Sequence, residues 1–229
     1  MSAVEWTVPV GADQVTAVYD PSLGGTEVAL FVCAHGAGGN MSDRGMLAVD
    51  RALRAAGVGV IRFNFVYTEK EGRRPDPMPL LMETVAAVVD RARHELRSTG
   101  GTRTRPLIIG GRSMGGRAAS MLAADGFAAD GLLLLAYPLH PAGKPQQLRD
   151  AHLPRIRMPV LCFNGTRDPL CTPSLMERAL TTVRAPWQMQ WIEGADHSFH
   201  VLKSSGRTDP DVMTEIATVS RAWVDRMPG

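Results

Sequence analysis

The sequence is poor in cysteine, with only three in 229 residues: Cys33, Cys162 and Cys171. Their spacing matches no zinc-binding pattern, and an odd number argues against a disulfide framework. Cys33 and Cys162 lie in apolar runs, so we expect them to be small buried residues. Cys171 follows Asp168 in a predicted loop, and nothing in the sequence indicates that its thiol is a nucleophile.

The sequence also lacks long apolar runs and an excess of charge of either sign. No run approaches the roughly 20 residues needed to cross a bilayer. The N-terminus, MSAVEWTVPVGADQ, has no basic stretch followed by an apolar one. Lysine and arginine number 25 against 23 acidic residues, a balance that predicts neither a nucleic-acid nor a membrane partner. We expect a cytoplasmic protein, and the pattern predicts no oligomeric state.

No internal repeat, low-complexity tract or linker divides the chain, so residues 1–229 are predicted to form a single domain. Chains of this length are ordinary for one α/β domain, and 45% hydrophobic residues suffice for a large core. Short β-rich runs alternate with helical periodicity. The first two runs indicate an antiparallel edge, whereas the later runs lack in/out alternation, as strands buried on both faces do.

The predicted strands cover residues 5–8, 14–19, 28–34, 58–63, 107–110, 132–136, 160–164 and 187–192. The predicted helices cover residues 46–56 after a Ser42 cap, 81–96 before Gly100 and Gly101, and 212–223 with Pro210 in the first turn. This alternation predicts an α/β fold, with a mostly parallel sheet and helices on both faces. In such folds the chemistry lies beyond the carboxyl ends of the strands.

A serine lies in a glycine-rich turn between a predicted strand and a predicted helix. Residues 107–116 read LIIGGRSMGG, which contains the pattern G-x-S-x-G centred on Ser113. The serine of this pattern occupies a sharp, strained turn, so the residues at Gly111 and Gly115 must be nearly free of side chain. The alternatives are an incidental serine and a phosphate-binding loop, but the glycine patterns of phosphate loops are absent. Ser113 is the predicted nucleophile.

Small residues also follow the predicted strand that ends at position 34, where the sequence reads HGAGG. Backbone N–H groups in such a stretch can stabilise a developing oxyanion. We predict Ala37 as one donor, with Gly38 as the close alternative, and Met114, directly after the nucleophile, as the other. His35 is expected to tie down this loop, and a flexible glycine turn is the alternative.

Serine attacks well only when a base removes its proton and an anion fixes the tautomer of that base. Asp168 follows the strand at 160–164 in the segment GTRDP, and His197 follows the strand at 187–192 in the segment GADHSF. Their order after Ser113 is the one expected for this kind of elbow. We predict His197 as the base and Asp168 as its partner.

Other histidines and a neighbouring aspartate are weaker candidates. His94 lies in an amphipathic helix, His152 lies in a proline-bounded loop, and His200 follows His197 too closely to share its turn. Asp196 is adjacent to the base, and adjacent loop side chains seldom form the required buried hydrogen bond. No residues show metal-ligand spacing, so the predicted mechanism uses no metal and no cofactor.

Candidate substrate contacts are Gly38, Tyr67, Tyr137 and His140, which lie near predicted strand ends. Residues 137–159 hold five prolines and are too few for a large helical cap. An open site with minimal or no cap favours a small or protruding soluble acyl group over a long lipid chain.

Three arginines also lie next to predicted strand ends: Arg62, Arg112 and Arg167. A guanidinium suits carboxylates, so these arginines could bind an acidic substrate group. Their more ordinary role is pairing with internal carboxylates. Of the three, Arg112 is the candidate for contact with substrate.

The segments CAHGAGGN, RFNFVY, GGRSMGGRAAS, LAYPLHPAGKPQQLRDAHL, GTRDP and GADHSF together resemble one branch of the α/β-hydrolases. Over roughly residues 28–205 the chain is similar to bacterial relatives of the hydrolase-like domain of Tex30 and of KAT8-regulatory-complex subunit 3. It is also akin to dienelactone-hydrolase-type esterases. The resemblance implies an α/β-hydrolase fold and places Ser113, Asp168 and His197 at the triad positions. Val66 departs from it, because proline is expected there.

These features predict a serine hydrolase that cleaves a small soluble carboxylic ester or thioester through an acyl-enzyme on Ser113. One alternative is a catalytically quiet hydrolase-fold protein that acts as a protein-interaction module. The complete Ser, Asp and His set argues against it, because an interaction scaffold does not need that set. A serine peptidase is a third possibility, weakened by the lack of an added domain that would select peptides.

Overall fold

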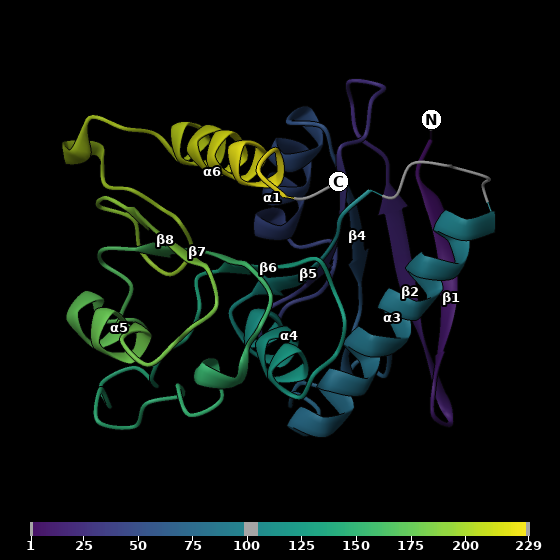
Figure 1. The fold of residues 1–229 in the computed structure, drawn as a ribbon, viewed down its shortest axis with the longest axis horizontal. Helices are drawn as coiled ribbons and strands as arrows, with labels where there is room; N and C mark the ends of the chain where they lie inside the picture. Colours follow the sequence, from purple (N-terminus) through teal and green to yellow (C-terminus); the bar gives the residue numbers. More distant parts are fainter. Residues whose placement is uncertain (1, 99–104, 228–229) are drawn as a thin grey trace.

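The uninterrupted apolar runs become the inner strands of an eight-stranded sheet in the computed structural model, which describes residues 2–98 and 105–227 (Figure 1). The strands are β1 (Val4–Val10), β2 (Asp13–Asp20), β3 (Ala29–Ala34), β4 (Val58–Phe63), β5 (Leu107–Arg112), β6 (Gly131–Leu135), β7 (Val160–Gly165) and β8 (Trp187–Ile192). Their order in the sheet is β1-β2-β4-β3-β5-β6-β7-β8. The β1–β2 and β2–β4 pairs are antiparallel and the other pairs are parallel, as predicted.

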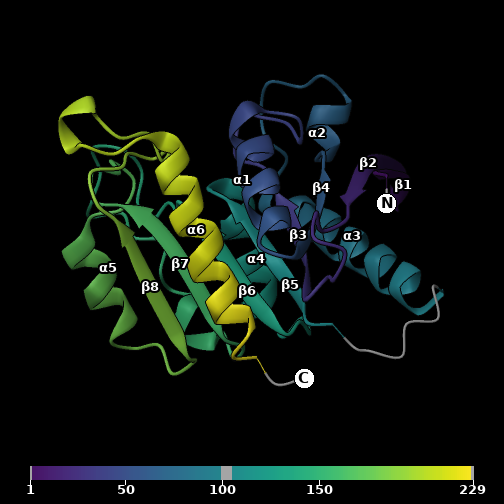
Figure 2. The same ribbon diagram turned by 90° about the horizontal axis from the view of Figure 1, so that it is seen from above.

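Helices cover both faces of this sheet. They are α1 (Arg44–Ala55), α2 (Val66–Glu69), α3 (Met78–Ser98), α4 (Met114–Ala124), α5 (Pro173–Leu180) and α6 (Asp209–Val224). Figures 1 and 2 show α1 and α6 on one face and α3, α4 and α5 on the other. Adjacent residues of β5 pack into the cores on opposite faces of the sheet. Ile108 packs on the face of α1 and α6, and Ile109 packs on the other face. Burial on both faces explains why the inner strands show no in/out alternation.

The structure corrects the predicted cap of α1 and confirms the predicted first turn of α6. Ser42 is not the cap of the first helix, because α1 begins at Arg44 and Asp43 occupies the N-cap position. Ser42 instead donates its backbone N–H to the Asn40 side chain at 2.8 Å, within the turn that precedes the helix. At α6 the hydroxyl of Thr208 accepts from the backbone N–H of Asp211, and Pro210 lies in the first turn as predicted. The predicted helix end at Gly100 and Gly101 falls outside the described residues.

In the part of the chain that the structure describes, no helical cap covers the carboxyl ends of the strands. The segment between β6 and β7 contains one short 3-10 turn, Leu153–Arg155, and the rest of it is irregular. This confirms the prediction of a fold without a cap domain and leaves the strand ends open to ligand. All three cysteines are free and buried, including Cys171. Among the described helices none has the length and apolar character required to span a bilayer.

Candidate active site

Ser113 lies in a strained turn between β5 and α4, and the surrounding glycines make that turn sterically possible. Its φ of 51° and ψ of −115° lie where residues with a side chain are rarely found. Its backbone N–H donates to the carbonyl of Leu135 at 2.8 Å, which fixes the turn to β6. A Cβ at Gly115 would come within 2.6 Å of the Ala34 side chain, and one at Gly111 would collide with the Ala34 carbonyl. The glycines therefore let the serine approach the end of β3.

We expect Gly111→Ala to lower the free energy of unfolding by about 3–5 kcal/mol, because its new methyl group meets a rigid backbone carbonyl as well as an unfavourable φ of 142°. Gly126→Ala is the matched control. Its φ is 91°, and no heavy atom lies within 4 Å of the added Cβ. This control measures the conformational cost alone, about 1 kcal/mol. Urea unfolding of both variants tests the difference, and equal losses would contradict the steric explanation.

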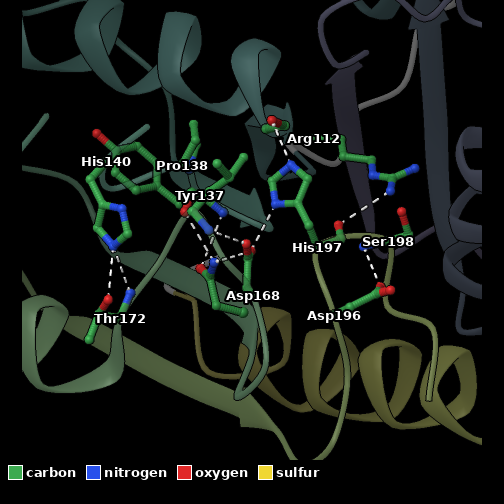
Figure 3. Close-up of polar contacts among 12 residues, drawn as sticks. Arg112, Tyr137, Pro138, His140, Asp168, Thr172, Asp196, His197 and Ser198 are labelled. Carbon is green, nitrogen blue, oxygen red and sulfur yellow. Dashed lines mark hydrogen bonds and ion pairs between the residues drawn. The ribbon is translucent and has the colours of Figure 1, made fainter. Parts of the chain in front are cut away.

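A continuous chain of hydrogen bonds joins three side chains from three different loops (Figure 3). The Nε2 of His197 lies 2.9 Å from the Ser113 Oγ, and its Nδ1 lies 2.8 Å from the Asp168 Oδ2. Because a carboxylate can only accept, Nδ1 carries the proton and Nε2 is free to accept from the serine hydroxyl. The Asp168 side chain is fully buried, whereas the His197 side chain is 25% exposed. The structure therefore brings together all three residues predicted for the relay.

Asn164 is a site residue that the sequence reasoning missed. Its Nδ2 donates to the Asp168 Oδ2 at 3.2 Å and to the Tyr137 carbonyl at 3.1 Å. Its Oδ1 accepts from the Tyr137 backbone N–H at 3.1 Å. The other carboxylate oxygen of Asp168 accepts from the Leu170 N–H at 2.8 Å, so both oxygens are held in place. The sequence held one sign of this role, because Asn164 is a polar residue at the end of an otherwise apolar strand.

The loop that carries His197 is held by its neighbours. Asp196 accepts the N–H groups of Ser198 at 2.7 Å and His200 at 3.1 Å, so it closes its own turn and makes no bond to the His197 ring. Arg112 donates to the His197 carbonyl at 3.3 Å. Asp196 is therefore not the partner of the histidine ring, in agreement with the sequence prediction.

The structure places Arg112 on the opposite side of the elbow from α4. Its side chain lies beside Gly45 and lines an open groove between α1 and α6. Burial lowers the pKa of this guanidinium, and the carboxylates of Asp43 and Asp196 oppose that shift. This position supports the His197 loop and differs from the substrate contact predicted for Arg112.

The other two arginines have partners within the protein. Arg62 is buried and pairs with Asp20 at 2.5 Å and Asp50 at 3.3 Å. Arg167 is exposed and donates to the Gly194 carbonyl at 3.0 Å. Arg62 therefore has the ordinary internal role that the sequence analysis favoured.

The loop after β3 is anchored from the end of β4. Arg62 donates to the Met41 carbonyl at 2.7 Å, and Asn64 accepts the Met41 N–H at 3.0 Å. The His35 Nδ1 lies 2.8 Å from the Gly36 carbonyl, and its Nε2 accepts the Phe65 N–H at 3.3 Å. Burial lowers the pKa of His35, which favours the neutral ring. The prediction that His35 ties down this loop is confirmed.

The predicted oxyanion donors lie where free amides are available. Met114 is the first residue of α4, so its N–H has no partner within the helix. Ala37 and Gly38 are exposed, and Gly38 has a φ of 71°. Among the described residues, the Ala37 and Met114 amides donate to no protein acceptor. Tyr67 is nearly buried and packs its ring 5.9 Å from that of His35.

Two predicted substrate contacts are wrong. Tyr137 is fully buried, and its hydroxyl donates to the Arg149 carbonyl at 2.6 Å. His140 is buried beyond Asp168 in Figure 3, where its Nε2 accepts the Thr172 N–H at 3.1 Å. Each side chain hydrogen-bonds one loop to another. The segments packed against these strand ends bury both side chains, so neither faces a ligand. In the part of the chain that the structure describes, no group of three His, Cys, Asp or Glu residues is placed to hold a metal ion.

Comparison with known proteins agrees with this architecture. A family model described as an alpha/beta hydrolase domain matches residues 27–225. A dienelactone hydrolase from Anabaena variabilis is 20% identical, with a TM-score of 0.74 over 100% of this chain and 99% of that one. A lidless α/β serine hydrolase from Xanthomonas campestris is 21% identical, with a TM-score of 0.73 over 99% of this chain and 97% of that one. An α/β serine hydrolase homologue from Coxiella burnetii is 19% identical, with a TM-score of 0.73 over 94% and 98% of the two chains.

Proposed function

Because this chain belongs to the alpha/beta hydrolase domain family, we propose that it hydrolyses a small carboxylic ester or thioester through an acyl-enzyme on Ser113. The observation that carries the proposal is the hydrogen-bonded relay from Asp168 through His197 to Ser113, with heavy-atom distances of 2.8 and 2.9 Å. The printed names of the similar structures, a dienelactone hydrolase and a lidless serine hydrolase, support an ester-like substrate.

The geometry supports the following steps. Ser113 Oγ attacks the substrate carbonyl carbon while His197 Nε2 takes its proton, and Asp168 stabilises the resulting imidazolium. The backbone N–H groups of Ala37 and Met114 stabilise the oxyanion of the tetrahedral intermediate. The intermediate collapses to the acyl-enzyme as His197 returns the proton to the departing alcohol or thiol. Water then attacks the acyl carbon while His197 Nε2 takes its proton, and the second tetrahedral intermediate collapses as His197 returns that proton to the Ser113 oxygen, which releases the acid and the free serine.

The open strand ends support a substrate with a small or protruding soluble acyl group, since no cap encloses a long chain. We also propose that residues 1–229 act as one cytoplasmic domain without a nucleic-acid or membrane partner, on the support of the balanced charge. The narrower kinship to bacterial relatives of the Tex30 and KAT8-regulatory-complex subunit 3 domain is part of the proposal. Its support is segments such as YPLHPAGKP.

The experiment that tests this function combines turnover with active-site labelling. We expect the protein to hydrolyse p-nitrophenyl acetate and butyrate, and a fluorophosphonate to form one adduct on the peptide that contains Ser113. The same labelling should abolish hydrolysis, because phosphonylation removes the nucleophile. Absence of both turnover and adduct would contradict the proposal and favour the protein-interaction alternative.

A further inference from the structure

Arg112 directly precedes the nucleophile in the chain, but its side chain lies on the face of the sheet that α1 and α6 cover. Ile108 packs into the core on that face, and Arg112, four residues later in β5, lies on the same side. The side chain of Arg112 lines the open groove between the two helices, which has a volume of about 1270 Å³. A solvent-accessible groove therefore reaches a residue adjacent to Ser113.

The Arg112 guanidinium holds the backbone of the proposed base (Figure 3). Its Nη2 donates to the His197 carbonyl at 3.3 Å, although the two residues are 85 positions apart in the chain. Among the described residues, the His197 backbone forms no other hydrogen bond with protein, and neither does the guanidinium. One contact therefore joins the backbone of the base to the residue that precedes the nucleophile.

The part of this loop that follows the base is fixed by other contacts. Asp209, the first residue of α6, accepts the Val201 N–H at 3.1 Å. Phe199 is buried in the core on the face of α1 and α6, with a φ of 61° that is rare for a residue with a side chain. At His197 itself, the bond to Arg112 is the one backbone contact beside the hydrogen bonds of the ring.

Gly45, in the first turn of α1, makes room for the guanidinium. A Cβ at this position would collide with the Arg112 Nη1 and would lie 3.4 Å from its Cζ. Gly45 has a helical backbone, in which alanine is more favourable than glycine by roughly 1 kcal/mol. The glycine therefore weakens the helix at the one position where a methyl group would displace Arg112 from the His197 carbonyl.

Nearby carboxylates favour the charged form of this guanidinium without forming an ion pair with it. Burial lowers the pKa of Arg112, and the charges of Asp43, Asp196 and, more weakly, Asp168 oppose that shift. Among the described residues, no carboxylate oxygen lies within 4.0 Å of the guanidinium. A charged donor binds a carbonyl more strongly than a neutral donor does. With no ion pair to compete, Arg112 directs its charge at the His197 carbonyl.

We propose that Arg112 is a positioning residue, which holds the His197 carbonyl from the groove and thereby keeps Nε2 at 2.9 Å from the Ser113 hydroxyl. This inference rests on the proposed esterase function and adds to it a residue that touches neither the substrate nor the reacting atoms. The base must be aligned when it takes the serine proton and again when it delivers that proton to the leaving group. A misplacement of about 1 Å can lower the rate about a hundredfold.

Gly45→Ala tests the geometry without removing a charge. The new methyl group meets the end of a flexible side chain, so the guanidinium should move away from the His197 carbonyl while the helix gains propensity. We expect kcat for p-nitrophenyl butyrate to fall about tenfold to a hundredfold, with KM within about threefold. The Tm should be no lower than that of the wild type. Arg51→Ala, at an exposed arginine that lines the same groove, is the control and should keep kcat.

Arg112→Ala tests the guanidinium itself by chemical rescue. Its kcat should fall about as far as that of Gly45→Ala. Methylguanidinium can enter the open groove and should restore part of the loss, whereas it should not change the kcat of Arg51→Ala. A role of Arg112 in folding alone would not make kcat respond to a small cation at constant ionic strength.

A spectroscopic readout separates this inference from the esterase function. The His197 Nδ1–H that faces Asp168 should give a low-field proton NMR signal, which Arg112→Ala weakens and methylguanidinium restores. If the signal behaves in this way while no ester is hydrolysed, the positioning role stands and the esterase proposal fails. If kcat and the signal are unchanged in both variants, or if methylguanidinium reverses neither loss, the positioning role is overturned and the esterase proposal stands.

Discussion

Replacing Ser113 with alanine is expected to lower kcat for p-nitrophenyl butyrate by about 10⁵-fold to 10⁶-fold. The variant loses the oxygen that lies 2.9 Å from the His197 Nε2, so no acyl-enzyme can form on residue 113. Residual hydrolysis would come from water attacking a carbonyl held by the backbone amides. Alanine keeps the Cβ and the strained backbone, so unfolding should resemble that of the wild type. Steady-state kinetics together with Tm measure both effects.

A second serine–histidine pair provides the control for this prediction. Ser120 lies 2.8 Å from His152 within the core, but it has ordinary helical backbone in α4 and lies away from the strand ends. Its hydroxyl also donates to the Arg117 carbonyl at 2.8 Å. Ser120→Ala should keep kcat within about threefold of the wild type, because it leaves the relay intact. Comparable losses in both variants would show that the nucleophile has been misassigned.

Replacing Asp168 with asparagine is expected to lower kcat by about 10⁴-fold. The asparagine oxygen can still accept from the Leu170 N–H, which leaves the NH2 group facing His197. The His197 Nδ1 must then accept, so its proton moves to Nε2. A protonated Nε2 cannot take the proton of Ser113. Stopped-flow burst amplitudes should fall with kcat, because acylation itself is slowed.

Asp196→Asn is the matched control, with the same chemical change next to the same histidine. The Asp196 Oδ1 accepts from the backbone N–H groups of Ser198 and His200. An asparagine oxygen can accept both bonds, so we expect a loss of less than about tenfold. If Asp196→Asn were the inactive variant and Asp168→Asn the active one, the assignment of the acid would be reversed.

The relay could be predicted because local sterics and chain order both leave a trace in the sequence. The Ser113 turn needs glycine at positions 111 and 115, and the structure shows the backbone contacts that exclude a side chain there. Asp168 and His197 each follow a predicted strand, and parallel strands bring their carboxyl ends to one edge. Neither signal depends on the details of packing.

The surroundings of the relay could not be predicted in the same way. Tyr137 and His140 follow a strand end, as a substrate contact would, yet both are buried by neighbouring loops. Asn164 orients Asp168 from within β7, where the apolar pattern of the strand concealed it. Whether a polar side chain near a strand end faces ligand or protein depends on the segments packed against it.

The sequence by itself determined the order of strands and helices, the strained serine turn and which three residues the hydrogen-bonded relay joins. Each of these follows from interactions between residues close in the chain or from the period of the apolar pattern. Only the tertiary structure decided which arginines lack a counter-ion. Arg62 meets Asp20 across 42 positions of the chain, whereas Arg117 and Arg149 meet no carboxylate among the described residues. Pairing of charges distant in sequence depends on the folded path of the chain, because Coulomb energy depends on separation in space.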